Sequence, residues 1–191
     1  MGAVGGPNGA RKTGGRIMAV PVTTLFDEGT IGARVDALAG EIAAAIEGDF
    51  VIVGLLKGSF MFVADLSRAL HRAGAAPRIE FMRLSSYGMT KESAGEVHLL
   101  GDVPTEVAGK NVLLVDDIVD TGRSIAYARA LMEQRDAARI WTCALLDKPS
   151  RREVEVAVDF VGFEVDDVFV AGYGIDYAEQ YRDLPYIGVC D

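Results

Sequence analysis

The sequence predicts an α/β fold, with a mostly parallel, twisted sheet flanked by helices on both faces. Along the chain, segments with apolar residues at helical spacing alternate with short, continuous apolar runs that are typical of buried parallel strands. The chain has 191 residues, half of them hydrophobic, which suffices for one compact domain with a sizeable core. No apolar run approaches the roughly 18 residues of a membrane span, so we expect no membrane association.

The elements follow from these two patterns. Apolar residues in steps of three and four, beginning with Ile31 and Val35, predict the first helix. Ser59 follows a Lys-Gly turn and is the expected cap of the second helix. In chain order, we expect a helix over 30–47, a strand over 50–56, a helix over 59–72, strands over 78–86, 96–100 and 111–115, a helix from about 124 to 135, and a strand over 139–146. The remaining stretch, 160–191, is predicted to be weakly helical, with short apolar pieces between acidic and glycine-rich turns.

The composition limits the number of domains and the kinds of partner that the chain can have. Residues 1–19 are a glycine-rich tail that we expect to be flexible, and residues 20–191 are expected to form one domain. The two cysteines, Cys143 and Cys190, show no zinc or disulfide spacing, so a cytoplasmic location is the default. The net charge of −9 disfavours a nucleic-acid partner, which requires clustered Lys and Arg. A small anionic substrate remains compatible with it, because a local site can be electropositive.

Residues 112–124 carry the functional argument, and they read Val-Leu-Leu-Val-Asp-Asp-Ile-Val-Asp-Thr-Gly-Arg-Ser. An apolar strand ends at Asp116 and Asp117, and Asp120 follows after two apolar residues. In open α/β sheets, ligands bind outside the carboxyl ends of the strands. The helix start that follows offers free N–H groups and a positive dipole end to a phosphate, while carboxylates accept hydrogen bonds from sugar hydroxyls. The string therefore predicts a site for a sugar phosphate.

A purely structural alternative is an acidic turn followed by a capped helix, since acidic strand ends are common. A Walker-type nucleotide loop is excluded because the sequence has no Gly-x-x-x-x-Gly-Lys-Ser/Thr, and a Gly-x-Gly-x-x-Gly dinucleotide loop is also missing. The whole string is far more specific than any of its parts, which favours the functional interpretation.

This string closely resembles the phosphoribosyl pyrophosphate signature of type I phosphoribosyltransferases. Residues 55–59, Leu-Leu-Lys-Gly-Ser, resemble the pyrophosphate-binding loop of that family. Residues 85–88, Ser-Ser-Tyr-Gly, resemble the mobile loop that closes over its active site. Residues 146–150 and 169–188 resemble the base-binding segments of the hypoxanthine-guanine members in particular. The motifs occur in the expected order over residues 20–190.

The resemblance implies the fold of that family, with a small hood lobe built from about 20–30 and 147–191. It implies purine salvage, in which the 5-phosphoribosyl group passes from phosphoribosyl pyrophosphate to hypoxanthine or guanine, giving IMP or GMP and pyrophosphate. It also implies Mg²⁺ as cofactor and a homodimer or homotetramer. The transition state of the family is thought to be oxocarbenium-like. The reaction therefore needs a base, stabilised leaving-group charge and exclusion of water.

The resemblance also implies roles for the residues of the string. Asp120 is the implied general base, acting at purine N7. Asp116 and Asp117 are implied to hold the ribose hydroxyls, directly or through magnesium. The implied 5′-phosphate site consists of Thr121, Gly122, Arg123 and Ser124.

Pyrophosphate is implied to bind at Leu56, Lys57 and Gly58, with a cis peptide bond between Leu56 and Lys57. Arg182 would clamp it, a task that suits a planar guanidinium, and Asp176 would bind a second magnesium ion. Without the resemblance, an ordinary strand-to-helix turn is the simpler interpretation of the Lys-Gly-Ser segment.

Lys148 is the implied specificity residue, because an ammonium only donates hydrogen bonds and so suits the purine O6 rather than the amino group of adenine. Phe169 would stack on the purine, the backbone of Val170 would read the ring edge, and Ile118 would pack on the base. From the residues alone, a solvated surface lysine and a core phenylalanine are the simpler interpretations of Lys148 and Phe169. Ser86 and Tyr87 are implied to lie on the closing loop and to shield the reaction from water.

Two alternatives stay open at this point. One is another base specificity, such as xanthine, adenine or uracil; Lys148 favours a 6-oxopurine but does not separate hypoxanthine, guanine and xanthine. The other is a regulatory protein on the same fold that binds RNA or a nucleotide without catalysis, as the pyrimidine-operon attenuators do. The acidic net charge disfavours RNA, and Asp120, Lys57 and Arg182 favour an enzyme.

Overall fold

The computed structural model describes residues 21–87, 96–104 and 106–190, so the expected tail over 1–19 lies outside the described residues. The elements, in chain order, are β1 (Val22–Phe26), α1 (Glu28–Ala45), β2 (Phe50–Leu56), α2 (Phe60–Arg72), β3 (Arg78–Tyr87), β4 (Glu96–Leu99), β5 (Asn111–Val119), α3 (Arg123–Glu133), β6 (Arg139–Asp147), a 3₁₀ turn (Pro149–Arg151), β7 (Phe160–Glu164), β8 (Val170–Ala171) and β9 (Ile187–Cys190). Among the described helices, none combines the length and apolar character that crossing a bilayer requires.

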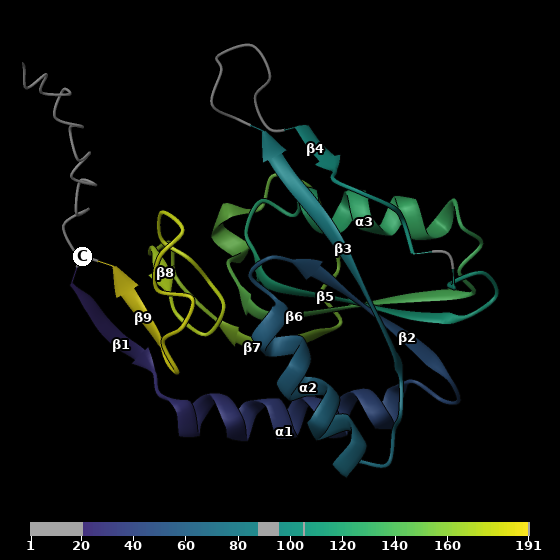
Figure 1. Ribbon diagram of the computed structural model, residues 1–191, viewed down its shortest axis with the longest axis horizontal. Helices are drawn as coiled ribbons and strands as arrows, with labels where there is room; N and C mark the ends of the chain where they lie inside the picture. Colours follow the sequence, from purple (N-terminus) through teal and green to yellow (C-terminus); the bar gives the residue numbers. More distant parts are fainter. Residues whose placement is uncertain (1–20, 88–95, 105, 191) are drawn as a thin grey trace, which may run out of the picture.

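Within the described residues, six strands form the large sheet in the order β4-β3-β2-β5-β6-β7, and every neighbouring pair except β3–β4 is parallel. Helices α1 and α2 cover one face of this sheet, and α3 covers the other (Figure 1). The central strand β5 is buried on both faces: Leu113 and Val115 pack in the apolar cluster with α1 and α2, and Val112 and Leu114 pack with α3. The predicted fold class is confirmed.

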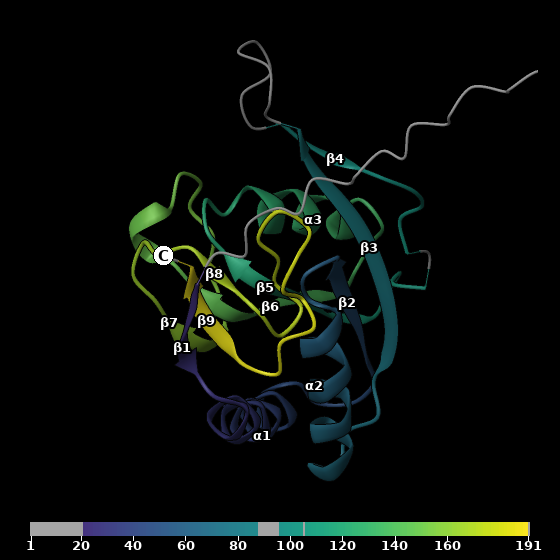
Figure 2. The ribbon, with the colours of Figure 1, turned by 60° about the vertical axis from the view of Figure 1, so that its left-hand side comes forward.

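Both ends of the described chain meet in a second, smaller sheet with the order β1-β9-β8, which is antiparallel (Figure 2). The range 147–191 expected for a hood lobe is too wide, because β7 pairs with β6 in the large sheet. Strands β8 and β9 contribute to the small sheet, and they join β1 from the other end of the chain.

The predicted elements differ from the structure in several respects, including strand β1, which was not expected. Helix α1 begins two residues early, since Asp27 caps it by accepting the N–H of Thr30 at 2.7 Å. Ser59 does not cap α2 with its side chain; its Oγ donates to the carbonyl oxygen of Leu55 at 2.6 Å. The stretch 160–191 forms strands and not helix, because its apolar pieces pair with β6 and β1. Such pairing overrides a weak local preference.

Candidate active site

The predicted site residues gather where parallel strands of the large sheet end. Leu56 ends β2, Val119 ends β5 and Asp147 ends β6, and these strands are neighbours. Because the carboxyl ends of parallel strands meet at one edge of a sheet, the connections that follow them share that edge. A cavity of about 250 Å³ opens there, and it is lined by Leu55, Leu56, Lys57, Leu84, Asp116, Asp117, Ile118 and Ser124.

Asp116 and Asp117 lie side by side in β5, which continues through them to Val119 and does not end at them as expected. Asp116 is buried, and its Oδ1 accepts the backbone N–H of Asp117 at 3.0 Å. Burial raises the pKa of Asp116 well above its ordinary value, and the charge of Asp117 adds to this. Burial also raises the pKa of Asp117, while its hydrogen bond with Asp116 and the positive charge of Arg182 oppose the rise. Two adjacent acids can accept hydrogen bonds from hydroxyl groups or bind a cation.

The loop after β2 rests directly on these acids. The peptide bond between Leu56 and Lys57 is cis, as the resemblance implied. A Cβ added at Gly58 would stand 1.7 Å from Oδ2 of Asp117, so any side chain at this position would displace the Asp117 carboxylate. A Cβ at Gly174 would stand 2.3 Å from the carbonyl oxygen of Gly58, so the C-terminal segment touches the same loop.

The connection from β5 to α3, residues 120–122, and the first turn of α3 are shaped for an anion. Gly122 is the N-cap of α3 with φ 84°, a conformation that favours glycine, and a Cβ there would stand 2.7 Å from the carbonyl oxygen of Val154. Gly122 has no side chain to cap the helix, and the N–H of Arg123 reaches Oγ1 of Thr121 at 3.4 Å. The first turn of α3 therefore offers N–H groups and the positive end of its dipole to an anion.

Asp120 lies at the rim of this edge with its side chain 40 % exposed. Its Oδ1 accepts Nε of Arg151 at 3.1 Å, and its carbonyl oxygen accepts a guanidinium N–H of Arg152 at 2.8 Å. The hydrogen bond and charge of Asp120 raise the pKa of Arg151. No role for either arginine was predicted from the sequence. The available signal was a pair of basic residues shortly after Lys148.

Lys148 is buried, with 6 % of its surface exposed, and is therefore not a solvated surface lysine. Its Nζ donates to the carbonyl oxygen of Val168 at 2.6 Å, and its backbone N–H donates to Val119 at 3.0 Å. Phe169, the residue after Val168, is 75 % exposed, which excludes the interpretation as a core residue. Val170 is buried in β8. The ammonium is thus fixed to the carbonyl oxygen of the residue that directly precedes a protruding aromatic side chain.

A second group of charges lies beside the β2 loop. Arg182 forms an ion pair with Oδ1 of Asp176 at 2.6 Å and donates to the carbonyl oxygen of Gly174 at 2.8 Å. Glu179, which was not predicted from the sequence, forms an ion pair with Nζ of Lys57 at 2.7 Å and lies 3.8 Å from Arg182. The hydrogen bond and charge of Lys57 lower the pKa of Glu179.

Of the remaining predicted residues, Ile118 is half-buried and lines the cavity. The backbone of Ser86 and Tyr87 belongs to β3, opposite Val97 and Glu96 of β4. Their side chains, and the loop segment 88–95, lie outside the described residues.

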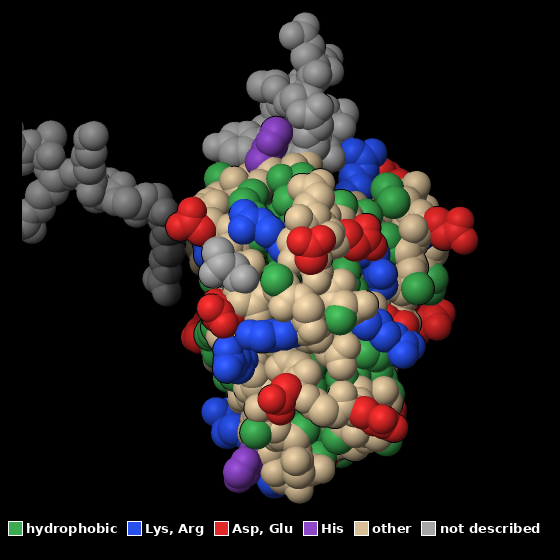
Figure 3. Space-filling model, turned by 90° about the vertical axis from the view of Figure 1, so that its right-hand side faces the viewer, with side chains coloured by type: hydrophobic (Ala, Val, Ile, Leu, Met, Phe, Trp, Pro, Cys, Tyr) green, Lys and Arg blue, Asp and Glu red, His purple; other side chains and the backbone are tan. Residues whose placement is uncertain are grey.

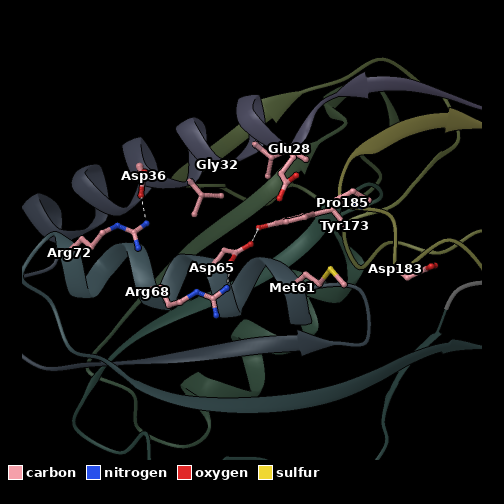
Figure 4. A pocket seen from close by; sticks show the side chains of 12 residues that line it. Glu28, Gly32, Asp36, Met61, Asp65, Arg68, Arg72, Tyr173, Asp183 and Pro185 are labelled. Atoms are coloured by element: carbon pink, nitrogen blue, oxygen red, sulfur yellow. Dashed lines mark hydrogen bonds and ion pairs between the residues drawn. The ribbon is translucent and has the colours of Figure 1, made fainter.

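A larger cavity, of about 450 Å³, lies elsewhere, between α1, α2 and the C-terminal segment (Figure 4). Two of its acids pair with arginines within it: Asp36 contacts Arg72 at 2.5 Å, and Asp65 contacts Arg68 and accepts the hydroxyl of Tyr173. None of the described residues that line it belongs to the predicted site. Cavity size alone does not single out the strand edge where the predicted site residues gather.

The acids at the strand ends fit the ligand set of magnesium. In phosphate-handling sites Mg²⁺ is bound by one or two carboxylates together with substrate phosphates. Burial disfavours the ionised forms of Asp116 and Asp117. The positive charge of a divalent cation would favour these ionised forms. In the described part of the chain, no group of three His, Cys, Asp or Glu could hold a cation without further ligands. A metal ion held by Asp116 and Asp117 would take further oxygen ligands from water or substrate phosphates.

A parallel sheet whose strand ends join paired acids to an anion-binding helix start is the architecture of a protein that binds sugar phosphates. Known proteins narrow this class, since the family model of the phosphoribosyl transferase domain matches residues 21–178. Hypoxanthine phosphoribosyltransferase of Escherichia coli is 44% identical over 170 residues, which cover 87% of this chain and 94% of that protein. Hypoxanthine-guanine phosphoribosyltransferase of Bacillus subtilis is 43% identical over 166 residues, covering 86% and 91%.

Solved structures agree with the sequence relatives. A crystal structure of a hypoxanthine-guanine phosphoribosyltransferase from Bacillus anthracis matches with a TM-score of 0.82 at 38% identity, covering 91% of this chain and 100% of that one. The chain belongs to the phosphoribosyltransferase family, which confirms the prediction made from residues 112–124.

Proposed function

We propose that this chain transfers the 5-phosphoribosyl group of phosphoribosyl pyrophosphate to hypoxanthine or guanine, a purine-salvage reaction that gives IMP or GMP and pyrophosphate. One observation carries the proposal: Asp116 and Asp117 lie between the start of α3 on one side and the loop at Gly58 on the other. This order offers a sugar site flanked by two anion sites. Phosphoribosyl pyrophosphate has the same order, with a ribose between a monophosphate and a diphosphate.

The monophosphate binds at the start of α3. The N–H groups of the first helical turn point toward it, and Gly122 lets the backbone approach closely. The hydroxyls of Thr121 and Ser124 donate further hydrogen bonds, and Arg123 adds a positive charge. The ribose hydroxyls donate to the carboxylates of the neighbouring acid pair, in hydrogen bonds that charge makes strong.

The diphosphate binds on the other side of the acids. Leu56, Lys57 and Gly58 present backbone groups and one ammonium, and Arg182 contributes a guanidinium whose planar fork fits phosphate oxygens. Magnesium, held by Asp116 and Asp117 and at a second position by Asp176, would neutralise charge on the diphosphate oxygens. This set of residues stabilises the negative charge that the leaving pyrophosphate gains.

The purine lies against Ile118 and Phe169, whose exposed ring offers a stacking surface. Lys148 is fixed by one hydrogen bond to Val168, and an ammonium has three N–H donors, so it can also donate to the purine O6. The backbone of Val170 reads the ring edge. This arrangement favours a 6-oxopurine over adenine.

In the reaction a purine nitrogen bonds to C1 of the ribose while the bond from C1 to pyrophosphate breaks. Asp120 accepts the proton that the purine loses at N7, and Arg151 holds the carboxylate in place through its hydrogen bond. General base catalysis of this kind contributes about 10²- to 10⁴-fold to a rate. We expect Ser86 and Tyr87, which the structure has at the end of β3 and not on a loop, to help exclude water from the charged ribose.

Steady-state turnover with phosphoribosyl pyrophosphate and Mg²⁺ tests this function. Five bases are compared, namely hypoxanthine, guanine, xanthine, adenine and uracil. We expect turnover with hypoxanthine and guanine that is lost when the metal is chelated. Preferred use of adenine or uracil would contradict the assignment of Lys148, and no turnover with any base would contradict the function.

A regulatory RNA-binding protein on the same fold is the rival proposal. On the face of the molecule in Figure 3, Lys and Arg side chains are interspersed with Asp and Glu and do not form one basic patch. We therefore expect no nucleic-acid partner and, because the two cysteines show no zinc or disulfide spacing, a cytoplasmic enzyme. Titration calorimetry against hypoxanthine, uracil and a short RNA hairpin separates the two proposals, since tight hairpin binding would favour the regulator.

We further propose that the chain assembles as a homodimer or homotetramer. Ile79 and Phe81 lie on one face of β3 and are 40% and 43% exposed, and Phe60 at the start of α2 is 39% exposed. The ring of Phe81 lies over Gly54 and close to Val63, and Val63 is one helical turn from Phe60. Ile79, Phe81 and Phe60 are therefore exposed apolar residues on neighbouring elements. In the related enzyme of Trypanosoma cruzi, the C-terminal region has been studied for its role in oligomeric state. Analytical ultracentrifugation tests this, and a monomer at micromolar concentration would contradict it.

A further inference from the structure

Glu179 contacts both cations that the proposed function assigns to pyrophosphate. Its two carboxylate oxygens accept hydrogen bonds from Nζ of Lys57 at 2.9 and 2.7 Å. A guanidinium nitrogen of Arg182 lies 3.8 Å from the same carboxylate. Lys57 and Glu179 are 122 residues apart in the sequence, so the fold brings them together.

The turn that carries Glu179 is closed by backbone hydrogen bonds. Tyr177 and Gln180 exchange N–H···O bonds of 3.1 and 3.0 Å. The N–H of Glu179 donates to Oδ2 of Asp176 at 2.8 Å. Loss of the side-chain charge at position 179 removes none of these bonds, so the carboxylate is not needed to hold the turn together.

A carboxylate and a phosphate are alternative partners for the same Lys and Arg side chains. The side chain of Glu179 is 69% exposed and that of Lys57 is 47% exposed, so solvent screens their ion pair. A screened pair is weak enough for a bound diphosphate to displace it, and it can form again when the diphosphate leaves.

We propose that Glu179 is a positioning residue that competes with the pyrophosphate groups of substrate and product for Lys57 and Arg182. In the ion-paired arrangement it keeps both cations beside the β2 loop. Because the diphosphate must displace it, Glu179 weakens the binding of phosphoribosyl pyrophosphate and of product pyrophosphate. The inference rests on the proposed function, which assigns the two cations to pyrophosphate.

Glu106 offers a matched control. It is also an exposed glutamate that joins an arginine and a lysine, at 3.1 Å from Arg78 and 3.2 Å from Lys110. Arg78 begins β3 and Lys110 directly precedes β5, so this cluster lies at the amino ends of the strands, away from the site. Glu106→Gln therefore changes net charge and breaks an equivalent ion-pair group without touching the proposed diphosphate site.

Titration calorimetry with inorganic pyrophosphate and Mg²⁺ measures the competition directly. We expect Glu179→Gln to bind pyrophosphate about two- to fivefold more tightly than the wild type, the range that exposed ion pairs account for. Glu106→Gln should bind like the wild type. In turnover, the KM for phosphoribosyl pyrophosphate should fall in Glu179→Gln while the KM for hypoxanthine stays the same, a split that a merely structural role would not produce.

Unchanged or weaker pyrophosphate binding in Glu179→Gln would overturn the inference, and so would an equal gain in Glu106→Gln. Lys57→Ala and Arg182→Ala test the underlying site separately, and both should weaken pyrophosphate binding. If neither does, the assignment of the site fails whatever Glu179 does. If both weaken binding and Glu179→Gln does not tighten it, only the role of Glu179 fails.

Discussion

Charged side chains are arranged differently in two regions. One is the cavity between α1, α2 and the C-terminal segment, here called the groove, and the other is the edge where the strands end. In the groove, Asp36 lies against Arg72, and Asp65 lies against Arg68 and the hydroxyl of Tyr173 (Figure 4). At the strand edge, the two adjacent acids of β5 lie side by side, and burial raises the pKa of both. In the groove, Asp36 and Asp65 each lie against an arginine, whereas at the edge two acids lie side by side and burial disfavours the ionised form of each. Strongly shifted carboxyl pKa values are typical of functional sites, which favours the edge as the candidate site.

The largest expected effect falls on Asp120 at the strand edge. Asp120→Asn keeps the shape of the side chain but cannot accept the purine proton, so kcat should fall by about 10²- to 10⁴-fold. The KM for phosphoribosyl pyrophosphate should change little, because the phosphate and ribose contacts remain. Turnover equal to the wild type in a steady-state assay would rule out Asp120 as the base.

Lys148→Ala should come next in size. Removing a charged donor to the purine O6 costs about 1.5–3 kcal/mol, so the KM for hypoxanthine and guanine should rise roughly 10- to 100-fold. The KM for phosphoribosyl pyrophosphate should stay close to that of the wild type. Unchanged Michaelis constants for both bases would remove Lys148 from the base site.

A gain in stability should accompany a loss of function at Asp116. Asp116→Asn removes a carboxylate whose charge burial disfavours, and stabilising changes of this kind amount to about 0.5–2 kcal/mol. Urea unfolding at pH 7 in the presence of a chelator measures the difference. Added Mg²⁺ should stabilise the wild type more than the variant, since a ligand that binds the folded state raises its stability.

The carboxylate of Asp116 makes the free energy of unfolding depend on pH. The pKa of Asp116 in the folded state is raised above the ordinary value of 3.8, so its neutral form is favoured by folding. The stability that protonated Asp116 contributes to the folded state is fully present below the ordinary pKa, and it is lost as the pH rises through the raised value. The stability advantage of Asp116→Asn over the metal-free wild type should therefore grow from acid toward neutral pH. An advantage that shrinks over this interval would contradict the burial argument.

The smallest effect is expected in the groove. Asp36 and Arg72 have side chains that are 59% and 60% exposed, and exposed ion pairs contribute about 0.2–1 kcal/mol. A double-mutant cycle with Asp36→Asn and Arg72→Gln should give a coupling in this range, with kcat and KM unchanged. A large change in activity from either variant would show that the groove takes part in function and would remove the contrast between the two regions.

Much of the fold was predictable because its signals are local. The run at Phe50–Leu56 predicted β2 with its observed bounds, and the helical spacing after Ile31 predicted α1 within two residues at each end. The C-terminal strands were missed because each is short and forms only by pairing: β7 pairs with β6, β9 pairs with β1, and β8 pairs with β9. The continuation of β5 through its two acids was missed for the same reason, since residues 118 and 119 pair with β6.

By itself, the sequence determined the order of the elements from α1 to β6 and the acid-and-glycine string of residues 112–124, because both depend on neighbours along the chain. It also marked the family to which the chain belongs, which the relatives confirmed. Only the tertiary structure decided that Lys148 is buried while Phe169 protrudes, and that Glu179 meets Lys57 and Arg182. Those contacts join segments far apart in sequence, and they depend on which strands become neighbours in the sheet and on how the C-terminal segment folds back over their ends.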